Sequence, residues 1–217
     1  KNNEECKELE VEYKTSMVSH VSMEPMSALA NFIDGNLHIY AGHQMGTTLP
    51  STIANYTGLK PNNIIYHPHL IGGSFGRKIE YELTILASLA ALATKKPVKV
   101  IFTREDDMAF AHPRTPTVQK LRALVASKTC IGINHDVACA TMQLAPFFPA
   151  FTHPPIIDGR PLKDSQIKHE AYVMLGSNNW YDIENQTANH FRQFSVEKTI
   201  PVRAVRSVGN NYTFLGK

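Results

Sequence analysis

The residues most able to do chemistry lie in a glycine-rich segment at residues 71–78, Ile-Gly-Gly-Ser-Phe-Gly-Arg-Lys. Three glycines and a serine within five residues remove most side-chain bulk, so the backbone can approach a ligand closely and point its N–H groups at it. We expect a long helix to begin directly after the glycines, and the unpaired N–H groups at a helix start add positive potential. Such a place suits an anion or an electronegative oxygen.

Two other interpretations of this segment come from its residues alone. A tight turn from a strand into a helix uses the same glycines and binds nothing. A phosphate-binding loop is disfavoured, because Lys78 comes two residues after Gly76, no Gly-Lys-Ser/Thr run is present, and the glycine spacing is not GxGxxG. The surrounding motifs therefore have to decide between a turn and a binding site.

Histidines and cysteines do not combine into a predicted metal site. His67 and His69 would share one face of a strand, but no third ligand is evident, so structural or surface histidines are favoured. The cysteines are widely spaced and form no CxxC pair, which favours free thiols over a zinc site, an iron–sulfur cluster or a disulfide framework. They are Cys6, Cys130 and Cys139.

Two helices are expected to position the glycine segment. The first spans residues 48–56, with Pro50 in its first turn and Gly58 after its end. The second spans residues 78–95 and is expected to be largely buried. Its apolar face would consist of Ile79, Leu83, Leu86, Ala90 and Ala93, widened by Leu89 and Leu92.

Strands are expected in the rest of the chain, and their order favours an α+β fold with mixed sheets, because it lacks regular βαβ alternation. The expected strands are 9–15 (half-buried), 27–33, 37–41, 63–66, 98–102, 119–127 and 135–143. Asp34-Gly35-Asn36 predicts a hairpin turn, 104–107 a solvated turn with local ion pairs, 146–161 a proline-rich loop, 167–175 a helix or strand, and 192–206 an extended segment. We expect one lobe at 1–145, carrying the glycine segment, and a loop-rich continuation at 146–217.

The composition excludes several classes of protein. Apolar residues make up 43% of the 217 residues and charged residues 19%, which is typical of a globular chain with a real core. The formal charge of +3 does not favour a nucleic-acid partner. No apolar run approaches the ~20 residues that a membrane span needs, and the polar N-terminus carries no signal peptide.

Five ordered motifs give the chain a family resemblance. They are His20-Val21-Ser22-Met23-Glu24-Pro25, His43-Gln44, the glycine segment, Pro97-Val98-Lys99-Val100 before Arg104-Glu105-Asp106-Asp107, and Arg206-Ser207-Val208-Gly209. In this order and spacing the chain resembles the large, molybdopterin-binding subunit of the xanthine oxidase family of molybdenum hydroxylases. The likeness is to the isoquinoline 1-oxidoreductase beta-subunit and aldehyde oxidoreductase branch, and it is close over residues 11–108 and 202–211.

The resemblance implies roles for particular residues. A glutamine at the position of Gln44 contacts the molybdenum centre, where its amide can donate to an oxo group or to the pterin. The backbone of the loop lies against the cofactor through Gly73, Ser74, Phe75 and Gly76. Ser74 departs from the more usual glycine. Arg206 would lie on the substrate side of the metal, although a surface arginine is the alternative. His20, Met23 and Glu24 are interpreted as scaffold, with Glu24 accepting from buried N–H groups.

The implied activity is the insertion of a water-derived oxygen into an N-heterocycle or an aldehyde, with electrons passed to iron–sulfur clusters. The implied cofactor is molybdopterin, in the cytosine dinucleotide form. The implied partners are the remainder of the large subunit, a small [2Fe-2S] subunit and a small-molecule substrate, with no nucleic acid and no membrane span. The compartment is undecided between cytoplasm and periplasm, and the resemblance favours the bacterial periplasm.

One part of the family's machinery is not present in this chain. The glutamate that serves as general base lies far toward the C-terminus of the full subunit, and no residue after Arg206 corresponds to it. We therefore expect a fragment of an oxidoreductase subunit that, as isolated, neither retains molybdopterin nor turns over substrate, and that self-associates through surfaces meant for its missing parts. The alternative is a non-catalytic binding or assembly module that retains the fold. We expect Gln44, the loop amides and Arg206 to converge on one hollow.

Overall fold

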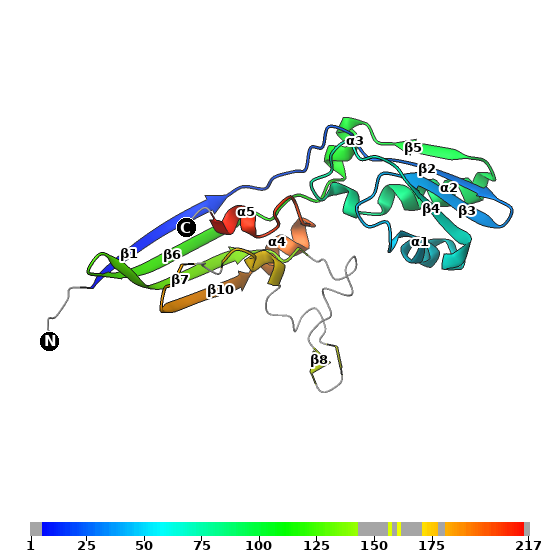
Figure 1. Ribbon diagram of the computed structural model, residues 1–217. Helices are drawn as coiled ribbons and strands as arrows, with labels where there is room; N and C mark the ends of the chain where they lie inside the picture. Colours follow the sequence, from blue (N-terminus) through cyan, green and yellow to red (C-terminus); the bar gives the residue numbers. More distant parts are fainter. Residues whose placement is uncertain (1–5, 143–155, 158–159, 162–170, 178–180, 215–217) are drawn as a thin grey trace. The chain divides into compact units, whose positions relative to one another are not determined.

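The computed structural model describes residues 6–142, 156–157, 160–161, 171–177 and 181–214, which form two compact units (Figure 1). One is the glycine-loop unit, Ser19–Ala111. The other is the long-sheet unit, Lys1–Val18 with His112–Lys217. The expected lobe boundary at 145/146 lies outside the described residues and stays a prediction.

The glycine-loop unit is built on a four-stranded sheet with the order β4-β3-β2-β5. Its strands are β2 (Ser27–Ile33), β3 (Asn36–Ala41), β4 (Ile64–Pro68) and β5 (Val98–Ile101). β2 is antiparallel to both β3 and β5, whereas β4 is parallel to β3. The predicted hairpin is confirmed: Asp34 and Gly35 both have positive φ, at 50° and 80°, as a two-residue turn matching the strand twist requires.

Two helices cover one side of this sheet. Helix α1 (Leu49–Thr57) ends as predicted at Gly58, whose left-handed backbone lets its N–H donate to Ala54 O at 3.0 Å. Helix α2 (Glu82–Thr94) packs against β2 and β5. The core between helices and sheet consists of buried apolar side chains, including Ala30, Leu37, Ile39, Ile53 and Leu83.

The expected helix at 78–95 begins four residues later than predicted. Gly76 has φ 107°, residues Arg77–Ile79 form a single 3-10 turn, and Glu80 is extended, so the α-helix starts only at Glu82. The predicted buried face is only partly right, because Leu83 is fully buried but Leu86 and Leu89 remain 49% and 41% exposed. Apart from Leu83, the buried face consists of small residues that let the helix approach the sheet closely: Thr84, Ala87, Ser88 and Ala91.

The expected solvated turn at 104–107 is a helix, α3 (Arg104–Ala109). Thr103 accepts from Asp106 N with its side chain while the Asp106 carboxylate accepts from Thr103 N, which is a capping box. Asp107 is 2% exposed, so this segment carries a buried charge.

The long-sheet unit has a four-stranded sheet of order β1-β6-β7-β10. Its strands are β1 (Lys7–Thr15), β6 (Thr117–Ala126), β7 (Thr129–Cys139) and β10 (Asn185–Arg192). The first three pair antiparallel, and β10 is parallel to β7. Shorter elements are β8 (Ile156–Ile157), β9 (Arg160–Pro161), a 3-10 turn at Ala171–Met174, α4 (Phe194–Thr199) and α5 (Asn210–Thr213). A core cluster joins Val137, Cys139, Met142, Val173, Ala204 and Tyr212.

Two predictions for this unit need correction. β1 is a strand but is not half-buried, because Leu9, Val11 and Tyr13 on its apolar face keep 37–45% of their surface exposed at the edge of the sheet. Residues 192–206 are not extended throughout, because α4 interrupts them. Within 167–175, residues 171–174 form the 3-10 turn and 167–170 lie outside the described residues, as does most of the expected loop at 146–161.

The described part of the chain offers neither a cluster of metal ligands nor a membrane-spanning helix. There, no group of three or more His, Cys, Asp or Glu side chains could hold a metal ion, and none of the helices has both the length and the apolar character that crossing a bilayer demands. The cysteines are free thiols, as predicted.

Candidate cofactor site

The glycine loop presents backbone donors. Gly73 and Phe75 have left-handed backbones, with φ 87° and 57°, on either side of Ser74. Alternation of this kind turns successive N–H groups toward one concave side of the chain. Among the described residues no group accepts from the N–H of Gly73 or of Ser74. Two donors are therefore available to a ligand.

Gln44 is joined to this loop by its backbone and its side chain. Gln44 N donates to Lys78 O at 2.8 Å. Gln44 Oε1 accepts from Ser74 Oγ and from Gly76 N, the latter at 3.2 Å. The side chain is exposed, and its Nε2 bonds to no described residue. The amide NH₂ is the end left to meet a ligand.

His43 holds the turn that carries Gln44. Its Nδ1 accepts from Met45 N at 2.9 Å, so the ring proton is on Nε2, which donates to Glu80 O at 3.2 Å. Burial lowers the pKa of His43 to about 4, which outweighs the contact with Glu80 O. The ring is therefore neutral and ties the Gln44 turn to the segment that follows the loop.

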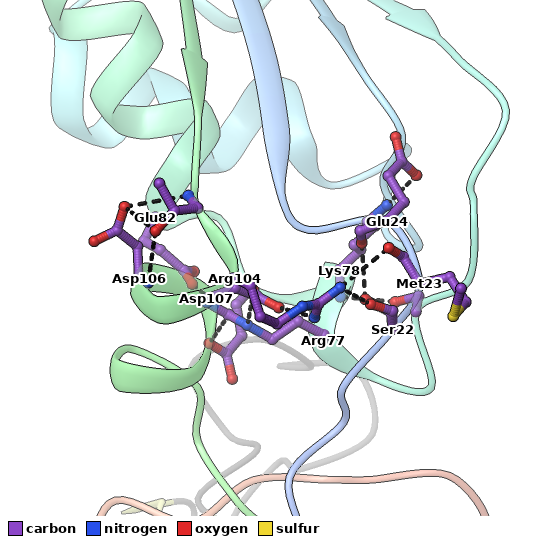
Figure 2. Close-up of polar contacts among 12 residues, drawn as sticks. Ser22, Met23, Glu24, Arg77, Lys78, Glu82, Arg104, Asp106 and Asp107 are labelled. Carbon is purple, nitrogen blue, oxygen red and sulfur yellow. Dashed lines mark hydrogen bonds and ion pairs between the residues drawn. The ribbon is translucent and has the colours of Figure 1, made fainter.

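The segment 20–25 supports the loop from the other side (Figure 2). Glu24 N donates to Gly72 O at 3.0 Å, and Glu24 Oε2 accepts from Gly72 N at 2.6 Å and forms an ion pair with Lys78 Nζ. Burial by itself would raise the pKa of Glu24, but Lys78 and the Gly72 N–H outweigh it and the pKa is lowered. The expectation that Glu24 accepts from buried N–H groups is only partly right, because it accepts from the backbone N–H of Gly72 and this contact is exposed.

Arg77 anchors the end of the loop in a buried charge network. Its side chain is 0% exposed; Nε donates to Asp107 Oδ1 at 3.0 Å, and Nη1 bonds to Glu80 Oε2 at 2.8 Å and to Glu82. Arg104 extends the network to Asp107 at 3.2 Å and to Met23 O at 3.0 Å. Figure 2 shows that these side chains lie between the loop, the segment 22–24 and α3. The network links three parts of the chain that surround the glycines.

The electrostatics of this network follow from burial. Burial alone would lower the pKa of Arg77, but Glu82, Glu80 and Asp107 together raise it. Burial and the nearby Glu80 raise the pKa of Glu82. Three carboxylates share two guanidinium groups, so the network carries one surplus negative charge when all five groups are ionised.

Sequence reasoning missed this network. A signal was available: Arg77, Glu80 and Glu82 lie within six residues at the start of a largely apolar helix, which is where charges of opposite sign can pair. Asp107, 30 residues away in sequence from Arg77, carried no such signal, because it was interpreted as part of a solvated turn.

The predicted site residues fall into two groups. The structure brings Gln44, Ser74 and Gly76 together, with Gly73 and Phe75 in the same loop. Phe75 is 43% exposed and so is not a core residue. Arg206 belongs to the long-sheet unit, where it is exposed and its carbonyl accepts from Arg114 Nη2 at 2.7 Å. Its predicted approach to the cofactor stays a prediction, as do the roles of the loop residues.

Comparison with known sequences shows the family to which the chain belongs. Residues 1–146 match the molybdopterin cofactor-binding domain family. The chain belongs to this family. The residues fit the cofactor, because the free N–H groups of Gly73 and Ser74 and the outward Gln44 amide are all donors, and molybdopterin is rich in acceptors.

Two relatives illustrate the membership. A protein of Gluconacetobacter polyoxogenes named membrane-bound aldehyde dehydrogenase (pyrroloquinoline-quinone) is 32% identical over 96% of this chain and 26% of its own length. Isoquinoline 1-oxidoreductase subunit beta of Brevundimonas diminuta is 32% identical over 64% of this chain and 18% of its own length. The chain thus spans about a quarter or less of these relatives. Their names are those of oxidoreductases, which does not favour a non-catalytic binding module.

Two solved structures show the same fold. The aldehyde oxidoreductase from Desulfovibrio gigas matches with a TM-score of 0.68 and 19% identity over 94% of this chain and 20% of that chain. Quinoline 2-oxidoreductase from Pseudomonas putida 86 matches with a TM-score of 0.68 and 17% identity over 94% of this chain and 24% of that chain. The α+β fold of the molybdenum-cofactor-binding type is confirmed, as is the resemblance to the molybdenum hydroxylases.

Proposed function

We propose that this chain is part of the molybdopterin-binding subunit of a molybdenum hydroxylase that hydroxylates an N-heterocycle or oxidises an aldehyde. The observation that carries the proposal is the junction of Gln44 with the glycine loop in a chain of the molybdopterin-binding family. Bound molybdopterin would supply two-electron redox chemistry at the metal. The chain's own residues would supply orientation and electrostatic stabilisation.

Each donor has a distinct task in this proposal. The Gln44 Nε2 group donates a hydrogen bond to an acceptor of the cofactor, which a carboxylate at that position could not do. The N–H groups of Gly73 and Ser74 donate to it without bringing a net charge into the site. The N–H of Gly76 contributes indirectly, because it donates to Gln44 Oε1 and so helps to hold that side chain. Arg206 is proposed for the substrate side, where a guanidinium binds developing negative charge.

The proposal includes partners. Apolar side chains near the loop are strongly exposed, with Met23 at 89% and Leu70 at 97%, and Phe75 is 43% exposed. Exposed apolar surface of this kind typically marks an interface. We assign it to the remainder of the subunit, which would also provide the general-base glutamate. A small [2Fe-2S] subunit would take the electrons, the pterin would carry a cytosine nucleotide, and the periplasm is the proposed compartment.

Metal and pterin analysis of the complete protein tests the proposal. We expect about one molybdenum and one molybdopterin per chain, and a loss of at least tenfold in aldehyde or N-heterocycle oxidation for Gln44→Ala. Gln186→Ala is the matched control, because Gln186 is an exposed glutamine on β10 of the other unit that bonds only to nearby carbonyls. Absence of molybdenum from protein isolated from its own host, or equal activity of the two variants, would refute the proposed function.

A further inference from the structure

We propose that Ser74 is a positioning residue that fixes the orientation of the Gln44 amide; its purpose, though not its geometry, rests on the proposed function. The side chain of Ser74 lies at the centre of a chain of hydrogen bonds and is 6% exposed. Its hydroxyl is therefore not a ligand group. It works through Gln44.

The direction of these hydrogen bonds follows from the backbone N–H groups among them, which can donate but cannot accept. Lys78 N donates to Ser74 Oγ at 2.8 Å, and the hydroxyl donates its own proton to Gln44 Oε1. Gly76 N donates to the same Oε1 at 3.2 Å. Because a backbone N–H only donates, both neighbours of this end of the amide are donors. The end facing the loop must then be the oxygen.

A reversed amide would break this arrangement. Its NH₂ group would face Gly76 N–H, a donor against a donor, and the Ser74 hydroxyl would lose the acceptor of its own proton, although its second lone pair could accept from that NH₂. The backbone of Gln44 is held as well, through its N–H to Lys78 O. One residue, Lys78, thus fixes both the main chain of Gln44 through its C=O and, through its N–H and Ser74, the side chain of Gln44.

The arrangement determines which end of the Gln44 amide would face a bound cofactor. With Oε1 held by two donors, Gln44 presents only N–H protons outward. A glycine or alanine at residue 74 leaves the Gly76 N–H as the single restraint, at 3.2 Å. We expect the amide then to rotate between a donor-outward and an acceptor-outward state. Ser74 therefore keeps the NH₂ end of the Gln44 amide directed outward, so that the side chain acts only as a donor.

The test measures the mobility of the Gln44 side-chain nitrogen by ¹⁵N relaxation in the 217-residue chain. In the wild type we expect an Nε2 order parameter close to the rigid value of about 0.85, and for Ser74→Ala a value below about 0.6. Ser74→Thr keeps the hydroxyl and should restore rigidity. Ser51→Ala is the control, because exposed Ser51 on α1 of the same unit bonds only to Thr48 O, at 2.9 Å.

A second measurement links orientation to the cofactor. In the complete protein, Ser74→Ala should retain molybdopterin about fivefold less well than the wild type, and Ser74→Thr should recover it. Gln44→Glu keeps an acceptor for both donors but has no outward proton, so it should lose retention even though it stays ordered.

Each outcome bears on a defined claim. A rigid Gln44 amide in Ser74→Ala, or a mobile one in the wild type, overturns the positioning role; where Ser74→Ala does not fold, Ser74→Gly, which carries the more usual residue of the family, makes the same comparison. A mobile amide in Ser74→Ala together with no molybdenum in any variant leaves the positioning role standing and refutes the proposed function instead.

Discussion

Replacing Arg77 by methionine tests whether the buried charge network holds the glycine loop. Methionine keeps much of the apolar stem of arginine, so the change removes the guanidinium and creates little cavity. Glu80, Glu82 and Asp107 then lose the cation that they share. Asp107 retains Arg104, at 3.2 Å. Both glutamates lose this cation, and at Glu80, which is 4% exposed, water cannot easily replace it.

The burial of the partners determines the magnitude. The side chain of Arg77 is 0% exposed, with Glu80 at 4%, Asp107 at 2% and Glu82 at 31%. Removing one member of a buried ion pair lowers the free energy of unfolding by about 3–5 kcal/mol, because a charge is left without a partner. The loss should shrink as the pH falls, since burial raises the pKa of Glu82 and this carboxylate, without Arg77 beside it, gains a proton more readily.

Urea unfolding combined with amide hydrogen exchange provides the assay, because exchange resolves the glycine-loop unit from the long-sheet unit. We expect α2 and β2 amides to lose protection while β6 and β7 amides do not. Arg122→Met on β6 is the matched control, because Arg122 pairs with Glu10 and Asp136 but is 39% exposed, so water screens the loss. Equal destabilisation by the two substitutions would show that the Arg77 network does not stabilise the loop.

Four further outcomes are expected. Because burial lowers the pKa of His43 to about 4 from 6.5, the neutral ring stabilises the fold above pH 6.5; on the order of 3 kcal/mol is lost as the pH falls through 4, and His43→Gln should flatten this dependence in acid titrations followed by circular dichroism. Because burial and Glu80 raise the pKa of Glu82, wild-type stability falls as the pH rises from about 4.5 through the folded pKa, and Glu82→Gln should abolish that fall in denaturant titrations. Gly72→Ala would place a Cβ 2.7 Å from Glu24 Cβ and should lower the free energy of unfolding by about 1–3 kcal/mol, seen as a lower melting temperature. An unchanged melting temperature would contradict the close approach of the two segments. The isolated chain should self-associate through the exposed apolar residues near the loop, and a strictly monomeric mass in light scattering at micromolar concentration would contradict this.

Local rules of the sequence accounted for much of the fold. Asp34-Gly35 predicted a tight hairpin because both residues tolerate positive φ, and the turn has that form. Pro50 and Gly58 marked the two ends of α1. Alternating apolar residues identified the strands but not their coverage, as Leu9 and Val11 of the exposed strand β1 illustrate. Periodicity reports which side of a strand is apolar, and it does not report what lies against that side.

The start of α2 could not be predicted in the same way. The residues from Lys78 onward are compatible with a helix by propensity, but Arg77 has to reach two nearby glutamates, Glu80 and Glu82, and also Asp107 on α3. A short 3-10 turn and an extended Glu80 satisfy that demand, and the α-helix begins after them. Buried charges outweigh helix propensity, because an unpaired buried ion costs several kcal/mol and helix propensities differ by less than ~1 kcal/mol per residue.

By itself, the sequence determined the chemical inventory: a loop of small residues, an amide at Gln44 and the motif order that places the chain in the molybdopterin-binding family. Only the tertiary structure decided how these parts are used. Gln44 and Ser74 are 30 residues apart, and their pairing depends on the sheet and α2 bringing both segments beside Lys78. The direction of a hydrogen bond is a property of neighbours in space, and a linear sequence does not specify those neighbours.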